Sequence, residues 1–216
     1  MGRPKEHDEE TRAALLEAAE RLIEQHGVDE LSIRTVADEV GTTTRAIYSL
    51  FGSKDGLLVA LAMQSFVYLK DGLQRWPETR DPVSDLVELG AVMYRGFVRE
   101  RPSLFRLAFQ RIAPGLPLGP EFFDARAAVW AVLEMKVRRV EDAGLLGSRT
   151  VTEGAVEFNA MCEGLANAEL RGGTMLPGDQ GRVWRDAFDA LVRGFATPRL
   201  RPKPQRAAKQ PAKRAP

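Results

Sequence analysis

The side chains with the clearest chemical pattern lie between residues 42 and 54. Three threonines precede an arginine, a tyrosine and a serine, and no acidic residue occurs in this segment. Hydroxyl, guanidinium and phenol groups suit contact with the phosphates and base edges of a DNA groove. The apolar residues of the same segment recur three to four positions apart, which predicts a short helix with one buried face. These apolar residues are Ala46, Ile47, Leu50 and Phe51.

Neighbouring helices must support this short helix, because an isolated helix of fewer than about 12–15 residues is marginal in water. Ser32 is a good N-cap for a helix over 33–40, and Gly41 permits a left-handed turn after it. The pattern predicts a helix-turn-helix, whose second helix, residues 43–51, enters the major groove. A helix over 9–26 precedes the unit, and Ser53 caps a long helix ending near Trp76.

The candidate DNA contacts lie on the outer faces of these helices or at the start of the long helix. Lys54 belongs to the set because a helix N-terminus favours phosphate. The full set is Arg34, Thr35, Thr42, Thr43, Thr44, Arg45, Tyr48 and Lys54.

Composition indicates a soluble globular protein of a reducing, cytoplasmic compartment. Of 216 residues, 44% are hydrophobic and 28% charged, and no apolar run approaches the roughly 20 residues that span a bilayer. One cysteine, Cys162, excludes an internal disulfide framework. With only two histidines besides, a metal site within one chain is not expected, and no cofactor is predicted.

The charge distribution does not by itself announce a nucleic-acid binder. The net charge is +1, but seven of the cations lie in the proline-rich segment 198–216. The first 56 residues contain twelve acidic and seven basic residues, so this segment is acidic. Segment 198–216 is predicted to be a disordered tail, either solubilising or loosely bound to phosphate. Residues 1–7 are predicted to be a flexible arm, either solvated or touching DNA.

The rest of the chain predicts helices only. Further helical patterns cover 83–101, 103–110, 122–143, 152–170 and 182–196. The fold class is therefore all-α with about nine helices: a helix-turn-helix domain over 8–56 and a larger ligand-binding and dimerisation domain over 57–197. Lys136, Arg138 and Arg139 lie off the apolar stripe of their helix and are expected to be solvated.

Aromatic and methionine residues in the middle of the larger domain favour an apolar ligand pocket, although each one alone fits ordinary core packing. The pocket candidates are Met93, Tyr94, Phe97, Phe105, Phe109, Trp130, Phe158 and Met161. Glu163 lies on an otherwise apolar helix, where it can pair with an arginine, face a partner subunit or orient a polar ligand group.

The last two long helices are the candidate interface between two copies of the chain. The first is rich in small residues, and the second has an apolar face too wide for one neighbour, although burial within the same chain is the alternative. The interface candidates are Ala160, Gly164, Asn167, Trp184, Phe188 and Leu191.

Residues 11–58 resemble the TetR family of bacterial transcriptional regulators. The matching positions are Gly41, Thr43, Ala46, Ile47, Tyr48, Phe51, Lys54 and Leu57. The resemblance implies a recognition helix over 43–48, phosphate contacts by Tyr48 and Lys54, and dimerisation through the last two long helices. Family members often carry a basic residue at position 44, whereas the cation here is Arg45.

Segments 99–111 and 158–172 resemble a regulator C-terminal domain that often carries a Trp and a His-Gly pair. Gly164 is kept, but Glu163 replaces the histidine and that helix has no Trp. A ligand contact through the histidine therefore does not transfer.

The predicted function is sequence-specific binding to a pseudo-palindromic operator in double-stranded DNA by a homodimer. The chain would act as a repressor released by a small apolar ligand. The alternative is a ligand-binding or scaffold dimer that has lost specific DNA binding, as the acidic N-terminal segment suggests. No residue set for catalysis occurs.

Overall fold

The computed structural model describes residues 5–110, 113, 115–171 and 178–196, and these are helical and connecting segments without a strand. The elements are α1 (Lys5–His26), α2 (Ile33–Val40), α3 (Thr44–Phe51), α4 (Lys54–Arg75), α5 (Pro82–Glu88), η1 (Leu89–Tyr94), α6 (Arg95–Glu100), α7 (Pro102–Phe105), η2 (Arg106–Gln110), α8 (Pro120–Asp142), α9 (Val151–Leu170) and α10 (Gln180–Phe195). In these described residues the twelve elements form nine continuous helical rods. The elements α5, η1 and α6 make one rod, and α7 and η2 make another.

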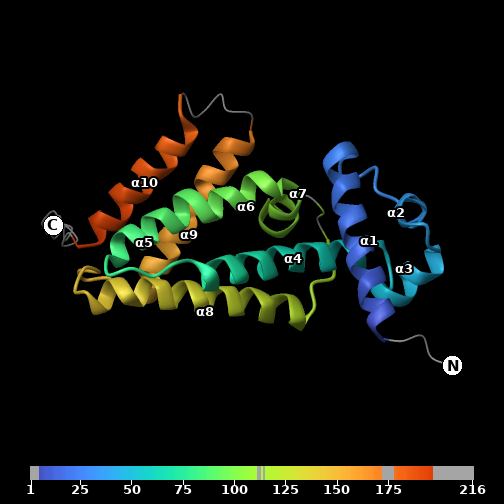
Figure 1. Ribbon diagram of the computed structural model, residues 1–216, viewed down its shortest axis with the longest axis horizontal. Helices are drawn as coiled ribbons and strands as arrows, with labels where there is room; N and C mark the ends of the chain where they lie inside the picture. Colours follow the sequence, from blue (N-terminus) through green and yellow to red (C-terminus); the bar gives the residue numbers. More distant parts are fainter. Residues whose placement is uncertain (1–4, 111–112, 114, 172–177, 197–216) are drawn as a thin grey trace, which may run out of the picture.

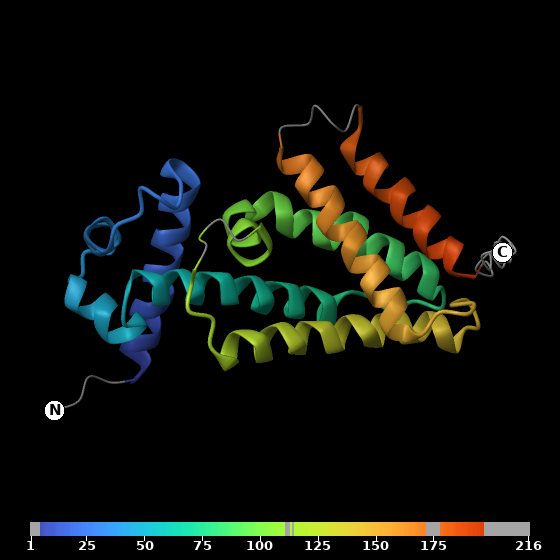
Figure 2. The same ribbon diagram turned by 180° about the vertical axis from the view of Figure 1, so that it is seen from behind.

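The molecule is elongated, with α1, α2 and α3 gathered at one end and the larger helical domain at the other (Figure 1). Helix α4 begins against the small unit and runs into the larger domain, where α8 lies beside it (Figures 1 and 2). The expected all-α architecture with about nine helices is confirmed.

The larger domain buries its biggest side chains between α5, α7, α9 and α10. Trp184, Phe188 and Phe105 are completely buried, and the rings of Trp184 and Phe188 pack against those of Tyr94 and Phe158. In Figure 2, α9 and α10 lie side by side across the outer surface of this domain.

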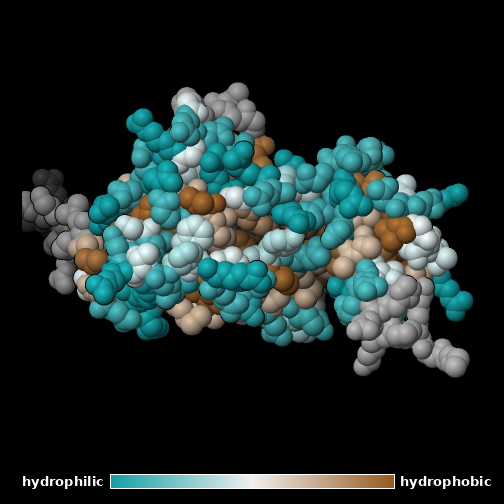
Figure 3. Space-filling view, in the orientation of Figure 1, coloured by the Kyte–Doolittle hydropathy of each residue, from teal (hydrophilic) through white to brown (hydrophobic). Residues whose placement is uncertain are grey.

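Helix α4 is long and apolar enough, by length and composition, to cross a membrane, and half of that apolar window is buried inside the fold. Residues such as Leu57, Leu61 and Phe66 face neighbouring helices, as in the core helix of a soluble domain. The outer surface seen in Figure 3 is largely hydrophilic, with apolar residues confined to smaller patches.

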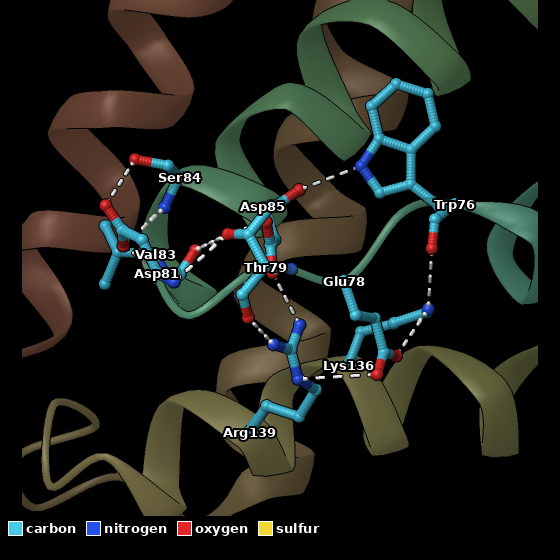
Figure 4. Close-up of polar contacts among 9 residues, drawn as sticks. All are labelled: Trp76, Glu78, Thr79, Asp81, Val83, Ser84, Asp85, Lys136 and Arg139. Carbon is cyan, nitrogen blue, oxygen red and sulfur yellow. Dashed lines mark hydrogen bonds and ion pairs between the residues drawn. The ribbon is translucent and has the colours of Figure 1, made fainter.

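The far end of α4 is fastened to α5 and α8 by a polar network (Figure 4). The Arg139 guanidinium donates to Asp85 at 2.7 Å, and Lys136 donates to Glu78 at 2.8 Å. Trp76 Nε1 donates to the Asp85 carbonyl at 3.1 Å. Burial raises the pKa of Asp85, but hydrogen bonds from Arg139 and then Thr79 outweigh it and hold that pKa below its ordinary value.

Three expectations need correction. Lys136 and Arg139 are not solvated, since their side chains are 10% and 25% exposed and both are ion-paired. Trp184 and Phe188 fill the core of their own chain and offer no surface to a second copy. The first helix begins at Lys5 and not at residue 9, so the expected arm of residues 1–7 is helical from Lys5, while residues 1–4 and tail 198–216 lie outside the described part.

Candidate nucleic-acid interface and ligand cavity

Helix α3 is bounded by local hydrogen bonds that the sequence specifies. Thr43 adopts an extended backbone as N-cap, and its side chain accepts from the Ala46 N–H at 3.3 Å. Gly41 has φ +70° and ends α2, while Gly52 has φ +76° and ends α3. Side chains with a Cβ rarely adopt these left-handed angles, so the two glycines set the direction in which the chain enters and leaves α3.

One face of α3 is buried and the other is presented to solvent. Ile47 is completely buried, and Ala46, Leu50 and Phe51 are half-buried against the neighbouring helices. On the outer face Thr43, Thr44 and Arg45 are exposed and Tyr48 is 54% exposed. Helix α3 lies with α2 at the free end of the molecule (Figure 1), so the exposed side chains of α3 belong to that end.

The remaining candidates for DNA contact are placed less uniformly. Arg34 is exposed and lies 3.9 Å from Asp38, which is a weak surface pair. The Thr35 hydroxyl is already used in the capping box of α2, since it accepts from the Ser32 N–H at 3.2 Å and donates to the Ser32 carbonyl at 2.8 Å. Thr42 and Lys54 are half-buried beside the ends of α3.

Gly56 is a positioning residue that the sequence pattern did not single out. A Cβ at this position would lie 1.9 Å from the Phe51 carbonyl oxygen, so the first turn of α4 packs directly on the last turn of α3. Ser53 caps α4 by accepting from the Gly56 N–H at 3.0 Å. On the other side, the Arg12 guanidinium lies 5.3 Å from the centre of the Phe51 ring. Helix α3 is thus fixed by α1 and α4 together.

The larger domain contains a cavity of about 580 Å³ between α4, η1, η2, α8 and α9. Five of the eight pocket candidates line it: Met93, Tyr94, Phe109, Trp130 and Phe158. Phe97, Phe105 and Met161 do not, which corrects the expectation for these three. Phe105 is completely buried and stacks on Phe109 with ring centres 5.2 Å apart, and Phe97 packs edge-on against Tyr94.

The cavity wall includes a few polar groups. Asn159 Nδ2 donates to Glu163 Oε1 at 2.8 Å, and both residues line the cavity. The Tyr94 hydroxyl is buried in the wall without a hydrogen-bond partner among the described residues. Within the same part of the chain, no group of three or more His, Cys, Asp or Glu side chains is placed to hold a metal ion.

Comparison with known proteins agrees with this arrangement over both domains. Residues 15–61 match the model of bacterial regulatory proteins of the tetR family, and residues 87–191 match the tetracyclin repressor-like C-terminal domain. The chain belongs to the TetR family of transcriptional regulators.

Its relatives in this family include characterised sequences and solved structures. The chain is 28% identical over 142 residues to an HTH-type transcriptional regulator of Mycobacterium tuberculosis, covering 59% of this chain and 61% of the relative. It is 39% identical over 84 residues to the HTH-type transcriptional regulator TtgR of Pseudomonas putida, covering 39% of this chain and 40% of TtgR. The matches thus span less than two thirds of these relatives' length.

A protein of unknown function from Rhodococcus sp. RHA1 has a similar structure, with a TM-score of 0.74 at 28% identity over 87% of this chain and 96% of that one. The TetR family regulator PfmR of Thermus thermophilus shares the fold with a TM-score of 0.61 at 24% identity, over 83% and 97%.

The remaining candidates for the TetR-type dimer interface differ in exposure. Ala160 and Gly164 are exposed on α9, in line with Val156, which is 51% exposed. Leu191 is half-buried on α10. Asn167 is engaged within the chain, since it accepts from Gln110 and donates to the Glu163 carbonyl, both at 2.7 Å. The open strip on α9 is therefore 156, 160 and 164.

A second junction between the two domains lies where α7 meets α1. Arg101 Nη1 donates to Glu20 Oε2 at 2.7 Å, and its guanidinium also contacts Tyr68 of α4. The Ser103 N–H donates to Glu24 at 3.1 Å. Burial raises the pKa of Glu20, and the nearby Arg101 offsets this only in part. The sequence gives no signal for this pair, because the partners are 81 residues apart.

Proposed function

We propose that this TetR-family chain is a cytoplasmic repressor that binds a pseudo-palindromic operator as a homodimer and is released by a small-molecule ligand. The observation that carries the proposal is the outer face of α3, where Thr43, Thr44, Arg45 and Tyr48 are exposed around the buried Ile47. In a helix-turn-helix this face enters the major groove, and two copies in a dimer read half-sites about 34–36 Å apart.

Dimerisation is supported by the strip of Val156, Ala160 and Gly164 on α9, which lets a second helix approach closely. A Cβ at Gly164 would meet nothing within 4 Å in the described part of the chain. Helices α2 and α3 lie at one end of the molecule, and α9 and α10 lie in the larger domain away from them (Figure 2). In the proposed dimer the first pair contacts DNA and the second pair contacts the partner.

Two structural connections support ligand control. The cavity is lined by Phe66 and Leu69 of α4, and α4 begins directly against α3 at Gly56. It is also lined by Phe109 of η2, and the rod that contains η2 begins at the Arg101–Glu20 junction with α1. A ligand that favours one arrangement of α4 and α7 therefore shifts the spacing of the two α3 helices, by an amount limited by its differential affinity for the two arrangements.

The alternative is a ligand-binding or scaffold dimer without specific DNA binding. The acidic balance of the first 56 residues favours it, with Asp38 and Glu39 exposed on α2 close to the reading face. The negative charge of Glu39 is partly compensated by Arg21, whose Nη2 lies 3.5 Å from Glu39 Oε1.

Selection of bound DNA from a random pool distinguishes the two functions. The purified full-length chain is expected to enrich one palindromic sequence with two half-sites, and its affinity should fall steeply as salt rises. Sedimentation of the complex should give two chains per site. Enrichment of no sequence, with binding only through non-specific charge, would establish the alternative.

A further inference from the structure

The cavity wall is built mainly for an apolar body. Aromatic rings come from all five lining elements and include Phe66, Tyr94, Phe109, Trp130 and Phe158. Its volume of about 580 Å³ lies within the roughly 300–1,000 Å³ of cavities that enclose drug-sized ligands. Two lining segments, η1 and η2, are π-helical, a rare form that occurs frequently at functional sites.

Glu163 places a carboxylate in this apolar wall, and no lysine or arginine among the described residues forms an ion pair with it. Among the described residues, its carboxylate accepts one hydrogen bond from a side chain, which comes from Asn159. Two other shielded acids of the same domain are paired with arginines. Glu169, six residues later on α9, accepts two hydrogen bonds of 3.0 Å from Arg95, and Asp85 accepts one from Arg139. A carboxylate in a site of low polarity is unfavourable without a countercharge, so an entering cation gains more here than in water.

The Tyr94 hydroxyl adds a second polar group that lacks a partner. Tyr94 as a whole is 6% exposed and lines the cavity, and its buried hydroxyl makes no hydrogen bond among the described residues. Burial, with smaller contributions from Cys162 and Glu163, holds the pKa of Tyr94 well above its ordinary value, so the phenol stays neutral. A neutral phenol oxygen can accept a hydrogen bond from a ligand's ammonium group.

The aromatic wall also favours positive over negative charge, because ring faces attract cations. Among the described residues, the cation of the wall is Arg126, which is exposed to solvent, where an ion pair contributes little. An anionic ligand would therefore form only a weak ion pair with Arg126, and its negative charge would be repelled by the Glu163 carboxylate in the same wall.

We infer that the cavity recognises an amphipathic organic cation, with its apolar body among the aromatic rings and a protonated amine on Glu163 and the Tyr94 hydroxyl. This inference rests on the proposed ligand-responsive function and names the class of ligand. It replaces the expectation of a purely apolar ligand.

Calorimetric titration with three ten-carbon probes tests the ligand class on the full chain without DNA. The probes are decylammonium and decanoate, each below its critical micelle concentration, and decanol below its solubility limit, all at pH 7. Decylammonium is expected to bind at least tenfold more tightly than either of the others. Equal or tighter binding of decanol or decanoate, or no binding of any probe, would overturn the inference. This ranking uses the unaltered chain and so needs no variant to fold.

Variants then assign the recognition to particular groups. Glu163→Gln should weaken decylammonium binding about tenfold and leave decanol unchanged, and Tyr94→Phe should reduce the same preference by a smaller factor. Glu100→Gln is the matched control, because this exposed residue at the end of α6 removes the same charge away from the cavity. A preference for decylammonium that survives Glu163→Gln contradicts the inference.

Addition of operator DNA separates this inference from the proposed function. If decylammonium binds with the expected preference but does not release the selected operator, the ligand site stands and the repressor function fails. If the operator is selected but decylammonium binds no more tightly than decanol or decanoate, specific DNA binding stands and the inference about the ligand class fails.

Discussion

At the scale of single residues, the outer face of α3 depends on a few side chains held by their neighbours. Ile47 is completely buried while Arg45 and Tyr48, on either side of it, project outward. The Thr43 hydroxyl caps the helix, which leaves its own O–H free to donate to a phosphate. Arg45 is the only cation of α3, so it should carry the largest electrostatic share of the contact.

Replacing Arg45 by Ala should weaken binding to the selected operator by at least about tenfold, since a good arginine contact to DNA contributes roughly 1–3 kcal/mol. The fold should be unaffected, because the side chain is exposed. If Arg45 contacts a phosphate, the slope of log affinity against log salt should also become shallower by about 1.8, because the proposed dimer carries two copies of Arg45. Arg138→Ala, an exposed arginine on α8, is the control and should change neither quantity. Unchanged affinity for Arg45→Ala would remove Arg45 from the interface.

At the scale of elements, the joint between α3 and α4 and the two π-helical stretches determine how the parts meet. The joint allows no side chain at Gly56, because a Cβ there would collide with the Phe51 carbonyl. The π-helical stretches η1 and η2 insert extra residues into otherwise regular rods. On the rod that contains η1, Tyr94 lines the cavity, whereas Phe97, three residues later, lies outside the wall.

Gly56→Ala should lower the free energy of unfolding by about 1–3 kcal/mol, the usual range for overpacking. It should also weaken operator binding, because α3 must shift away from α4. Gly96→Ala provides the contrast: this helical glycine of α6 has open space around a new Cβ within the described structure, so Ala should be neutral or stabilise by up to about 1 kcal/mol. Urea unfolding of both variants measures the difference. Equal effects at the two positions would contradict the tight joint.

At the scale of the whole molecule, the DNA-binding unit is attached to the larger domain twice. One attachment is α4, which is continuous from Lys54 to Arg75. The other is the contact of Arg101 with Glu20 and Tyr68, where the Glu20 side chain is 8% exposed and that of Arg101 is 34% exposed. Because both attachments reach cavity-lining elements, the position of α1 and α3 depends on the state of the larger domain.

Arg101→Met should lower the free energy of unfolding at pH 7 by about 2 kcal/mol, somewhat less than the loss of a fully buried ion pair, because Arg101 is partly solvated. The loss should be smaller at pH 5. Burial raises the pKa of Glu20 in the folded chain above its value in the unfolded chain. The folded state therefore binds the proton more readily, and the penalty for a charged Glu20 shrinks as pH falls through the folded pKa. Urea unfolding at both pH values checks this, and an equal loss at pH 5 and pH 7 would show that Glu20 is not the group responsible.

The sequence by itself determined the features that depend on near neighbours. The side chains of Ser32, Thr43 and Ser53 cap α2, α3 and α4 by accepting from the backbone N–H three residues later. Gly41 ends α2 and Gly52 ends α3, both with positive φ. The buried and exposed faces of α3 follow from the 3.6-residue period alone. The alternation of helices, and with it the all-α fold, could be predicted for the same reason.

Only the tertiary structure decided which distant residues meet. Arg101 with Glu20, Arg139 with Asp85, and the burial of Trp184 and Phe188 within their own chain depend on how helices pack, and a charge or an aromatic ring in sequence does not name its partner. Packing of the whole fold also decided that Phe97, Phe105 and Met161 lie outside the cavity wall, and that Glu163 lines the cavity with a hydrogen bond from Asn159. The physical reason is the sequence separation of the interacting residues. Caps and turns depend on atoms a few residues apart, whereas the partners of a side chain depend on how the whole fold packs.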